Sequence, residues 1–403
     1  MTPASTEKLL LALFITLQPI LALQCTLSEI PEDGQLNFRR LANKYGLSCE
    51  EHDVTTEDGY ILKLFHIPGD KARPVLLMHG IIDSADTFMI RGNGSMVAAL
   101  ARAGYDVWVG NKRGNRYSRR HKRFNPDIHK EYWDFSFHEI GLYDLPAKID
   151  YILARTGQTQ LSCIGHSQGN TVFYVLGSMR PEYNEKIKLL IALSPICYLH
   201  HLPPPAKNIV QAWPFIDRLF SLVGKHEVFS DFSLETNVLK TLCTAKGSYE
   251  LCGKGFILRI AGLDTDELEP DFLPIVMSHY PSGTSRKSGT HLLQLGLKRN
   301  FTQMDYGLQK NLAVYNSVTP PNYDLGKVTM RVALIVASND GMCSLTDVKI
   351  LRSRLPNVVE YRVLDWSKFN HIDYVWGRNM DRHLFPTVFS LLERFGDESK
   401  GDS

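Results

Sequence analysis

Short apolar runs alternate with longer helical patterns along most of this 403-residue chain. That alternation predicts a mostly parallel sheet whose strands are joined by crossover helices. The predicted buried strands cover residues 74–78, 105–109, 161–164, 187–193, 332–336 and 358–364, and an antiparallel hairpin over 54–67 precedes them. Continuous apolar runs are typical of strands that are covered on both faces. The expected fold class is therefore α/β.

The alternation is interrupted between residues 197 and 324, where no regular succession of strands and helices is visible. A helical cap inserted between two strands of the sheet explains this interval better than a second independent domain. The expected organisation is a core from 25–196 and 325–396, a cap over 197–324, and a disordered polar tail over 397–403.

Residues 1–24 are typical of a cleaved secretory signal. Lys8 precedes an apolar stretch, which Gln18 and Pro19 interrupt before it reaches the roughly 20 apolar residues that a membrane span needs. Cleavage is expected near residues 22–25. A retained membrane anchor is the alternative, and we predict no other membrane-spanning segment.

Seven cysteines gain importance in a secreted chain, where disulfides persist. Cys243 and Cys252 lie close together in a polar stretch, which suits a local disulfide. Cys163 lies in an apolar run and is expected to be a buried free thiol. Asn93 and Asn300 each begin an N-x-S/T sequon, so both are candidate glycosylation sites.

Charge is nearly balanced, with 45 basic and 43 acidic residues and a formal net charge of +2. No global field therefore indicates a nucleic-acid partner. The basic run from Arg113 to Arg123 is the local exception, and we expect it to form a solvated face. Binding to an anionic lipid surface is the alternative for this run.

The segment Gly165–Gly169 matches the pattern G-x-S-x-G. It follows a predicted strand and precedes a helical pattern over 170–179, and this context is what a nucleophile on a sharp strand-to-helix turn requires. We therefore predict that Ser167 is a nucleophile, with a plain glycine-rich turn as the alternative. A serine hydroxyl needs a neighbouring base to attack a carbonyl carbon.

The partners of such a serine follow it in the order acid, then histidine. His371 lies in the loop after the last predicted strand and is the candidate base, whereas His383 falls in a helix-like stretch. Asp340 follows the strand 332–336 and is the candidate acid. Asp347 is its rival, although that residue is better placed to cap or begin the next helix, over 348–354.

Two backbone N–H groups are needed to stabilise the oxyanion. The residue after the nucleophile, Gln168, supplies one, and Ile81 in the loop after an earlier strand supplies the other, unless Gly80 merely permits a turn there. We expect no metal, because His200 and His201 are adjacent and adjacent side chains point apart in regular structure. No dinucleotide motif follows a strand, so no organic cofactor is expected.

Eight segments together resemble one known family. They are TEDGY (56–60), HGI (79–81), GYDVW (104–108), GNKRGN (110–115), SRRH (118–121), WDFS (133–136), GHSQG (165–169) and NHID (370–373). With these segments the chain resembles the acid lipases, which include gastric lipase and lysosomal acid lipase, from about residue 51 to 395.

The resemblance implies an α/β-hydrolase fold, a cap with a mobile lid, and hydrolysis of triacylglycerol or sterol esters. It also implies the assignment of Ser167, Asp340 and His371 and the bridge between Cys243 and Cys252. The chain departs from the family where isoleucine replaces the usual leucine at position 81. It also departs around Asp340, where the sequence is NDGMC.

The expected activity is two-step acyl transfer on lipid esters at a lipid–water interface, by a secreted or lysosomal enzyme without metal or cofactor. Three alternatives stay open: a soluble esterase or peptidase with the same triad, a non-catalytic lipid carrier or storage protein, and a membrane-anchored enzyme. The sequence makes no prediction of the oligomeric state.

Overall fold

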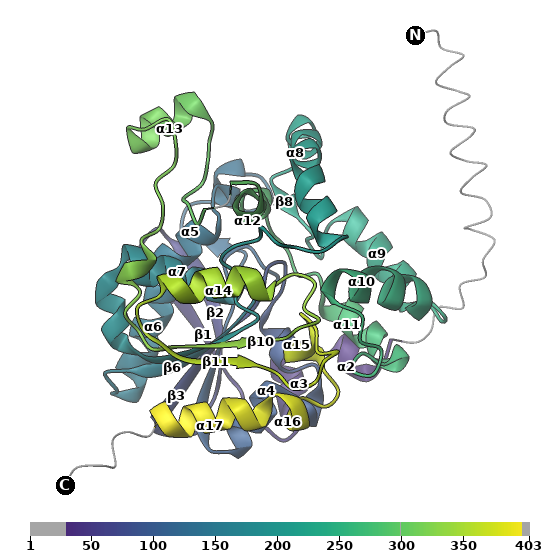
Figure 1. Cartoon of the computed structure of the whole chain (residues 1–403). Coiled ribbons are helices and arrows are strands. Elements are labelled where there is room, and N and C mark those ends of the chain that lie inside the picture. The colour runs from purple at the N-terminus through teal and green to yellow at the C-terminus, as the bar shows by residue number, and fades with distance from the viewer. Residues whose placement is uncertain (1–29, 299, 397–403) are drawn as a thin grey trace, which may run out of the picture.

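The computed structural model describes residues 30–298 and 300–396 (Figure 1). The predicted signal segment 1–24 and the polar tail 397–403 lie outside the described residues. At the centre lies a nine-stranded sheet of order β1-β2-β4-β3-β6-β7-β10-β11, with β5 paired to β2. The strands are β1 (Glu50–Thr55), β2 (Tyr60–Ile67), β3 (Asp70–Met78), β4 (Tyr105–Gly110), β5 (Arg120–His121), β6 (Leu161–His166), β7 (Ile187–Leu193), β10 (Val332–Val336) and β11 (Val358–Val363).

All the predicted strands are present in this sheet. β1 and β2 form the expected antiparallel hairpin, and β2 runs antiparallel to β4. From β4 across the sheet to β11, every neighbouring pair is parallel. The α/β fold class is therefore confirmed, and the carboxyl ends of β3, β6, β7 and β10 meet at one edge of the sheet.

Alternate side chains of the central strands enter two separate cores. In β3, for example, Val75 and Leu77 pack on one face, and Leu76 and Met78 pack on the other. Helices α3 (Phe38–Lys44), α4 (Met96–Arg102) and α17 (Phe385–Gly396) cover the first face, and α6 (Leu145–Thr156), α7 (Gln168–Met179) and α14 (Leu345–Arg354) cover the second (Figure 1). Shorter helices are α2 (Glu32–Gln35), α5 (Phe137–Glu139), α15 (Asp373–Trp376) and α16 (Met380–His383).

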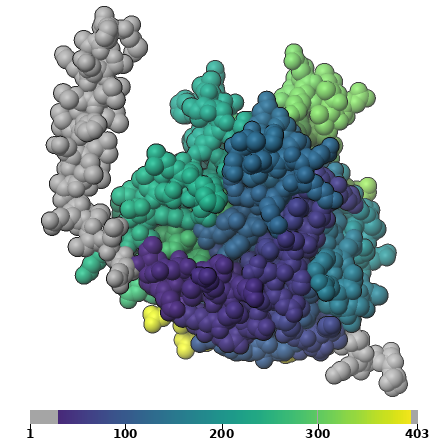
Figure 2. All heavy atoms as spheres, turned by 180° about the vertical axis from the view of Figure 1, so that it is seen from behind, coloured from purple at the N-terminus to yellow at the C-terminus, as the bar shows by residue number. Residues whose placement is uncertain are grey.

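Between β7 and β10 the chain leaves the sheet and forms mainly helices. These are α8 (Ala206–Leu222), α9 (Leu234–Thr244), α10 (Leu258–Ala261), α11 (Leu273–His279), α12 (Arg286–Lys298) and α13 (Leu308–Tyr315). A short antiparallel ribbon of β8 (Glu227–Val228) and β9 (Thr284–Ser285) lies among them in the chain. Figures 1 and 2 show α8 and α13 protruding on the same side of the molecule. Within residues 30–298 and 300–396, no helix combines the length and apolarity needed to cross a membrane.

The cysteines follow the prediction. Cys243 and Cys252 form a disulfide with an S–S distance of 2.05 Å, which confirms the local bridge. Cys163 is buried and free, as predicted, and Cys49, Cys197 and Cys343 are also buried free thiols. Both sequon asparagines, at positions 93 and 300, are exposed.

The basic run forms the predicted solvated face only in its second half, where Arg120, Lys122 and Arg123 are exposed. The Arg113 side chain is buried, and its guanidinium donates to Asp144 Oδ1 at 2.7 Å and to Asp58 Oδ2 at 2.5 Å. Arg116 and Arg119 are also largely buried and pair with carboxylates from distant parts of the chain. For Arg113, Arg116 and Arg119 the prediction was wrong. Most of their carboxylate partners are remote in sequence, so a local charge pattern cannot show that these cations are paired.

Candidate active site

Ser167 lies on a sharp turn between β6 and α7. Its backbone has φ 55° and ψ −123°, a conformation that non-glycine residues adopt rarely and at an energetic cost. The flanking glycines are required by close packing. A Cβ atom on Gly165 would lie 2.3 Å from Asn170 Oδ1, and one on Gly169 would lie 2.2 Å from the Met78 carbonyl oxygen. The G-x-S-x-G pattern therefore corresponds here to a strained turn that presents the serine hydroxyl at the edge of the sheet.

The structure brings the three predicted triad residues together. His371 Nε2 lies 2.9 Å from Ser167 Oγ, and His371 Nδ1 lies 3.0 Å from Asp340 Oδ1. The three side chains come from the loops that follow β6, β10 and β11. The backbone N–H groups of Met342 and Cys343 donate to Asp340 Oδ1 at 2.9 and 2.8 Å, which holds the carboxylate in place.

Ser194 is a further polar residue of this site that the sequence analysis did not identify. Its hydroxyl lies 2.6 Å from Asp340 Oδ2 and 2.7 Å from His371 Nδ1, so it lies between the acid and the base. It follows β7 directly and has a φ of 47°. Its position at the end of the strand next to β6 is a signal that sequence reasoning could have used.

Two contacts hold the loop that carries His371. The His166 ring donates from Nε2 to the His371 carbonyl oxygen at 2.8 Å. Burial lowers the pKa of His166 to about 3, so this ring stays neutral. The Ala261 carbonyl oxygen accepts from the backbone N–H of His371 at 3.1 Å and from that of Gly341 at 2.8 Å. A helix-end residue between β7 and β10 therefore supports both the histidine loop and the aspartate loop.

The rival acid lies elsewhere. Asp347 accepts from the backbone N–H of His201 at 3.0 Å and lies 2.7 Å from His201 Nδ1. Asp347 lies in the first turn of α14, so it begins this helix as predicted. It is not the N-cap, because the Ser344 side chain has that role and accepts from the Asp347 N–H. His383 lies in a helix, as predicted, at the end of α16.

Both segments that were predicted to supply oxyanion donors lie beside Ser167. A Cβ atom on Gly80 would lie 3.4 Å from Ser167 Cβ, so the chain just before Ile81 runs against the serine. Gln168 is the first residue of α7, where backbone N–H groups have no partner within the helix. Ile82 follows with a φ of 50°, a second unusual backbone conformation next to the serine.

Lys112 connects these two segments and was not identified from the sequence, where it directly precedes the basic run. Its Nζ donates to the Gly80 carbonyl oxygen at 2.7 Å and to Gln168 Oε1 at 3.0 Å. The side chain is only 4% exposed. Burial lowers the pKa of Lys112 to about 7, although the nearby Asp83 carboxyl opposes this effect. A buried amine therefore contacts both segments that are expected to supply the oxyanion donors.

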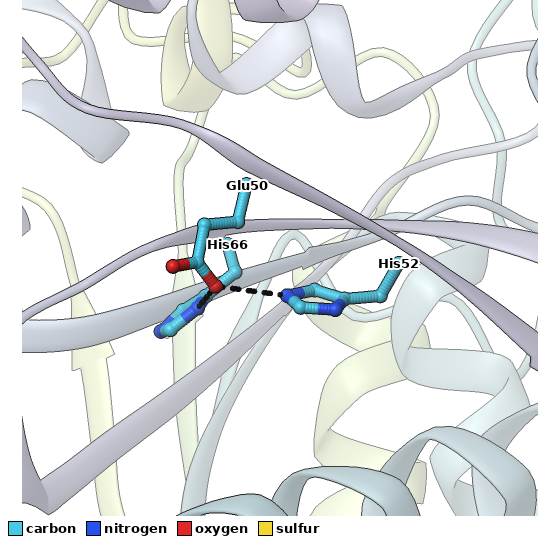
Figure 3. A group of neighbouring side chains, drawn as sticks. All are labelled: Glu50, His52 and His66. Atoms are coloured by element: carbon cyan, nitrogen blue, oxygen red, sulfur yellow. Dashed lines mark hydrogen bonds and ion pairs between the residues drawn. The ribbon is translucent and has the colours of Figure 1, made fainter.

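Two groups of side chains offer atoms that could hold a metal ion. They are Glu50, His52 and His66 (Figure 3), and His200, His201 and Asp347, and within each group the ligand atoms lie within 4.8 Å of one another. The expectation that His200 and His201 point apart was wrong, because they lie in an irregular segment where the rule for regular structure does not apply. Neither group includes Ser167, Asp340 or His371.

The triad is closed to solvent in this conformation. The exposed fractions of Ser167, His371 and Asp340 are 3%, 4% and 6%. Two open clefts of about 390 and 450 Å³ lie between the segment around Trp133 and the helices that follow β7, and the triad residues line neither of them.

Comparison with known proteins defines the class of the molecule. Residues 38–92 match the family described as a partial alpha/beta-hydrolase lipase region, and residues 73–245 match the alpha/beta hydrolase fold family. A naproxen esterase from Bacillus subtilis has the same fold, with a TM-score of 0.50 and 13% sequence identity over 92% of this chain and 99% of that one. The fold and these matches define an α/β hydrolase.

Curated relatives identify the family. Lipase 1 of Drosophila melanogaster is 37% identical over 92% of this chain and 83% of its own length. Gastric triacylglycerol lipase of Rattus norvegicus is 34% identical over 89% of this chain and 92% of its own length. The chain belongs to the acid lipase family and is a carboxylic ester hydrolase.

Proposed function

We propose that Ser167, His371 and Asp340 are the nucleophile, general base and acid of a serine lipase that hydrolyses triacylglycerols or sterol esters. The observation that carries this proposal is the continuous chain of contacts from Ser167 Oγ through the His371 ring to the Asp340 carboxylate, at 2.9 and 3.0 Å. The gastric relative is named as a triacylglycerol lipase, which supports triacylglycerol as a substrate class.

In the first step, His371 Nε2 takes the proton of Ser167 Oγ while the oxygen attacks the ester carbonyl carbon. Asp340 holds the imidazole with Nδ1 protonated and stabilises the imidazolium that forms. The alcohol leaves with the proton from His371, and an acyl group stays on the serine. Water then repeats the same sequence, which releases the fatty acid and restores the serine.

The developing oxyanion is stabilised by the backbone N–H groups of Gln168 and Ile81. Lys112 supports this arrangement because it bonds to the carbonyl oxygen of Gly80 and to the side chain of Gln168. These contacts connect the two donor segments to each other. Such fixed donors stabilise the transition state because they need no reorganisation when charge develops.

The helices between β7 and β10 supply a surface suited to lipid. We propose the organisation expected from the sequence, with a core over 25–196 and 325–396 and a cap over 197–324. Large apolar side chains of the cap are exposed, namely Phe215 (68%), Leu219 (47%), Leu222 (74%), Val223 (75%), Leu234 (79%), Val238 (49%) and Leu242 (47%). Exposed apolar clusters of this kind are typical of surfaces that meet a partner or a membrane. Contact with a lipid–water interface would open the cap above the buried triad.

A secreted or lysosomal destination completes the proposal. The signal-like segment 1–24, the bridge between Cys243 and Cys252, and the exposed sequons at Asn93 and Asn300 all suit passage through an oxidising compartment. Glycosylation at both asparagines is part of the proposal.

The experiment is hydrolysis of matched short-chain and long-chain glycerol esters from about pH 4 to about pH 8. The wild type is compared with Ser167→Ala and with Ser353→Ala, which changes an exposed serine of α14. We expect long-chain turnover that rises above the solubility limit of the substrate, vanishes in Ser167→Ala and persists in Ser353→Ala. Turnover of short-chain esters alone would favour the soluble esterase. Lipid binding without any hydrolysis would favour the carrier.

A further inference from the structure

A group of three potential ligands lies on the antiparallel hairpin at one side of the sheet, away from the residues considered so far. Glu50 and His52 alternate along β1, so their side chains share one face of the sheet. His66 on β2 is directly opposite Glu50 in the strand register. Figure 3 shows the carboxylate of Glu50 between the two imidazole rings.

The distances in this group suit a tetrahedral metal ion. Glu50 Oε2 lies 3.1 Å from His66 Nδ1 and 3.3 Å from His52 Nε2, and the three ligand atoms lie within 4.8 Å of one another. Zinc bonds to nitrogen and oxygen are about 2.0–2.2 Å long, so two ligands of a tetrahedral zinc ion lie about 3.3–3.5 Å apart. Two of the three separations are therefore already close to those of a bound ion.

The orientation of His66 is fixed by a buried carboxylate. Asp106 is 1% exposed, and its Oδ1 lies 2.7 Å from His66 Nε2. Trp108 Nε1 and the Gly69 N–H also donate to this carboxylate, at 2.6 and 3.1 Å. The Trp108 ring stacks on the His66 ring at a centroid distance of 3.7 Å. A carboxylate that accepts from one ring nitrogen leaves the other nitrogen free to bind a metal, an arrangement found behind many zinc ligands.

His52 supplies the second independent observation. Its Nε2 atom is buried and makes no well-oriented hydrogen bond within the described residues, although Glu50 Oε2 is near. The Tyr151 hydroxyl lies 3.1 Å from Nδ1 on the other side of the ring and fixes the ring orientation. A buried nitrogen is therefore directed at the point where the three side chains converge.

We propose that Glu50, His52 and His66 bind one Zn²⁺ ion, with water as the fourth ligand and Asp106 as the group that orients His66. Two imidazoles and one carboxylate form a ligand set that zinc commonly uses. The alternative is a metal-free ion cluster, in which a protonated His66 bridges Glu50 and Asp106.

The position of this site indicates a structural role. Asp106 is near the start of β4 and pairs with Pro74 in β3, whereas Met78 in β3 pairs with Gly165, two residues before Ser167. Four residues of parallel strand correspond to about 13 Å, so the site and the serine lie toward opposite ends of the strands. A bound ion would tie β1 to β2 without taking part in hydrolysis.

The test uses the full secreted chain without an affinity tag, after removal of metal by a chelator. Zn²⁺ is titrated in a calorimeter, and the absorption spectrum of a Co²⁺-loaded sample reports the coordination geometry. We expect one tight site per chain with a tetrahedral cobalt spectrum. We also expect Zn²⁺ to raise the unfolding temperature, because an ion that binds only the folded state stabilises it.

Two variants and one control assign the site. Two variants, His52→Gln and Glu50→Gln, should each weaken zinc affinity by about tenfold or more. Both should also lose the rise in unfolding temperature that Zn²⁺ causes in the wild type. His201→Gln removes a ligand from the other three-residue group and should leave zinc binding unchanged. Ester hydrolysis measured in parallel confirms that the variants fold. Absence of tight binding in the wild type, or binding that only His201→Gln removes, would overturn the proposal.

Discussion

The sheet and the proposed cap differ in the exposure of their apolar side chains. Every residue of β6 is buried, and so is every residue of β10. In α8 only Ala206, Val210 and Trp213 are buried, whereas Phe215 and Leu222 are 68% and 74% exposed. The sheet therefore holds the loops of the proposed triad in fixed positions, and the cap keeps apolar area available for something outside the chain. Changes in the sheet should alter chemistry or stability, and changes at the exposed apolar side chains of the proposed cap should alter the use of aggregated lipid.

The largest effect is expected at the acid. Asp340→Asn should lower kcat for a soluble short-chain ester by about 10⁴-fold, because an amide no longer holds the productive histidine tautomer or stabilises the imidazolium. Asp347→Asn is the matched control and should leave kcat within about twofold, since Asp347 contacts His201 and not His371. Equal losses in the two variants would remove the distinction between the acids. Steady-state kinetics on both variants measures the effect.

The second largest effect is expected on stability, at the buried ion pair of Arg113 and Asp144. Arg113→Met leaves the buried Asp144 carboxylate without its main partner and should lower the free energy of unfolding by about 3–5 kcal/mol. Arg120→Met removes a half-exposed ion pair with Asp53 and should cost less than about 1 kcal/mol. Denaturant titration of both variants gives the comparison. Similar unfolding midpoints for the two variants would show that the buried pair of Arg113 and Asp144 contributes no more to stability than the exposed one.

A pH-dependent effect is expected at the buried amine. The folded-state pKa of Lys112 is lowered to about 7 from 10.5, so the unfolded chain binds one more proton between these values. The wild type is therefore destabilised below pH 7 and regains stability as the pH rises, by about 1.4 kcal/mol per pH unit. The stability of Lys112→Met relative to wild type should be highest in acid and should fall between pH 7 and pH 10.

Thermal unfolding over this pH range measures the difference. Lys112 lowers the pKa of Asp83 in the wild type, so loss of this cation raises that pKa further. This second shift also lowers the stability of the variant relative to wild type as the pH rises. A stability difference that does not change with pH would show that the amine keeps its ordinary pKa. Lys122→Met, which changes an exposed lysine ten residues further along the chain, is the control.

The smallest effect is expected on the cap. Replacement of Leu222 and Val223 by serine removes apolar area from the exposed end of α8 and should weaken binding to lipid emulsions by about tenfold. Turnover of a soluble short-chain ester should not change. Ile128→Ser, at a side chain that is 75% exposed but lies outside the cap, should change neither quantity. An equal loss of turnover on soluble and emulsified substrates would contradict a specific role of these side chains in lipid binding.

Much of the sheet was predictable from local sequence. The bounds of β7 and β10 agree with the predicted strands to the residue, because continuous apolar runs end sharply there. The residues that the structure brings together around Ser167 were predictable for the same reason, since each follows the end of a strand. Their order along the chain restricted the choice further.

The rest depends on contacts between distant segments. Ser194 takes part in the site only because β7 and β10 are neighbours in the sheet. Lys112 was not identified because nothing near it in sequence shows that Gly80 and Gln168 contact its amine. The cap helices were not predicted individually, because partly exposed apolar side chains blur the periodicity that distinguishes a helix from a loop.

The carbonyl oxygen of Ala261 has a consequence for engineering. It lies within the interval that we assign to the cap, yet it accepts from the backbone of both His371 and Gly341. Transplanting the whole cap of another lipase into this chain would therefore also replace a support of the loops that carry the proposed triad. A graft that exchanges α8 and α9 but keeps the native segment around α10 would change substrate access and leave that support in place.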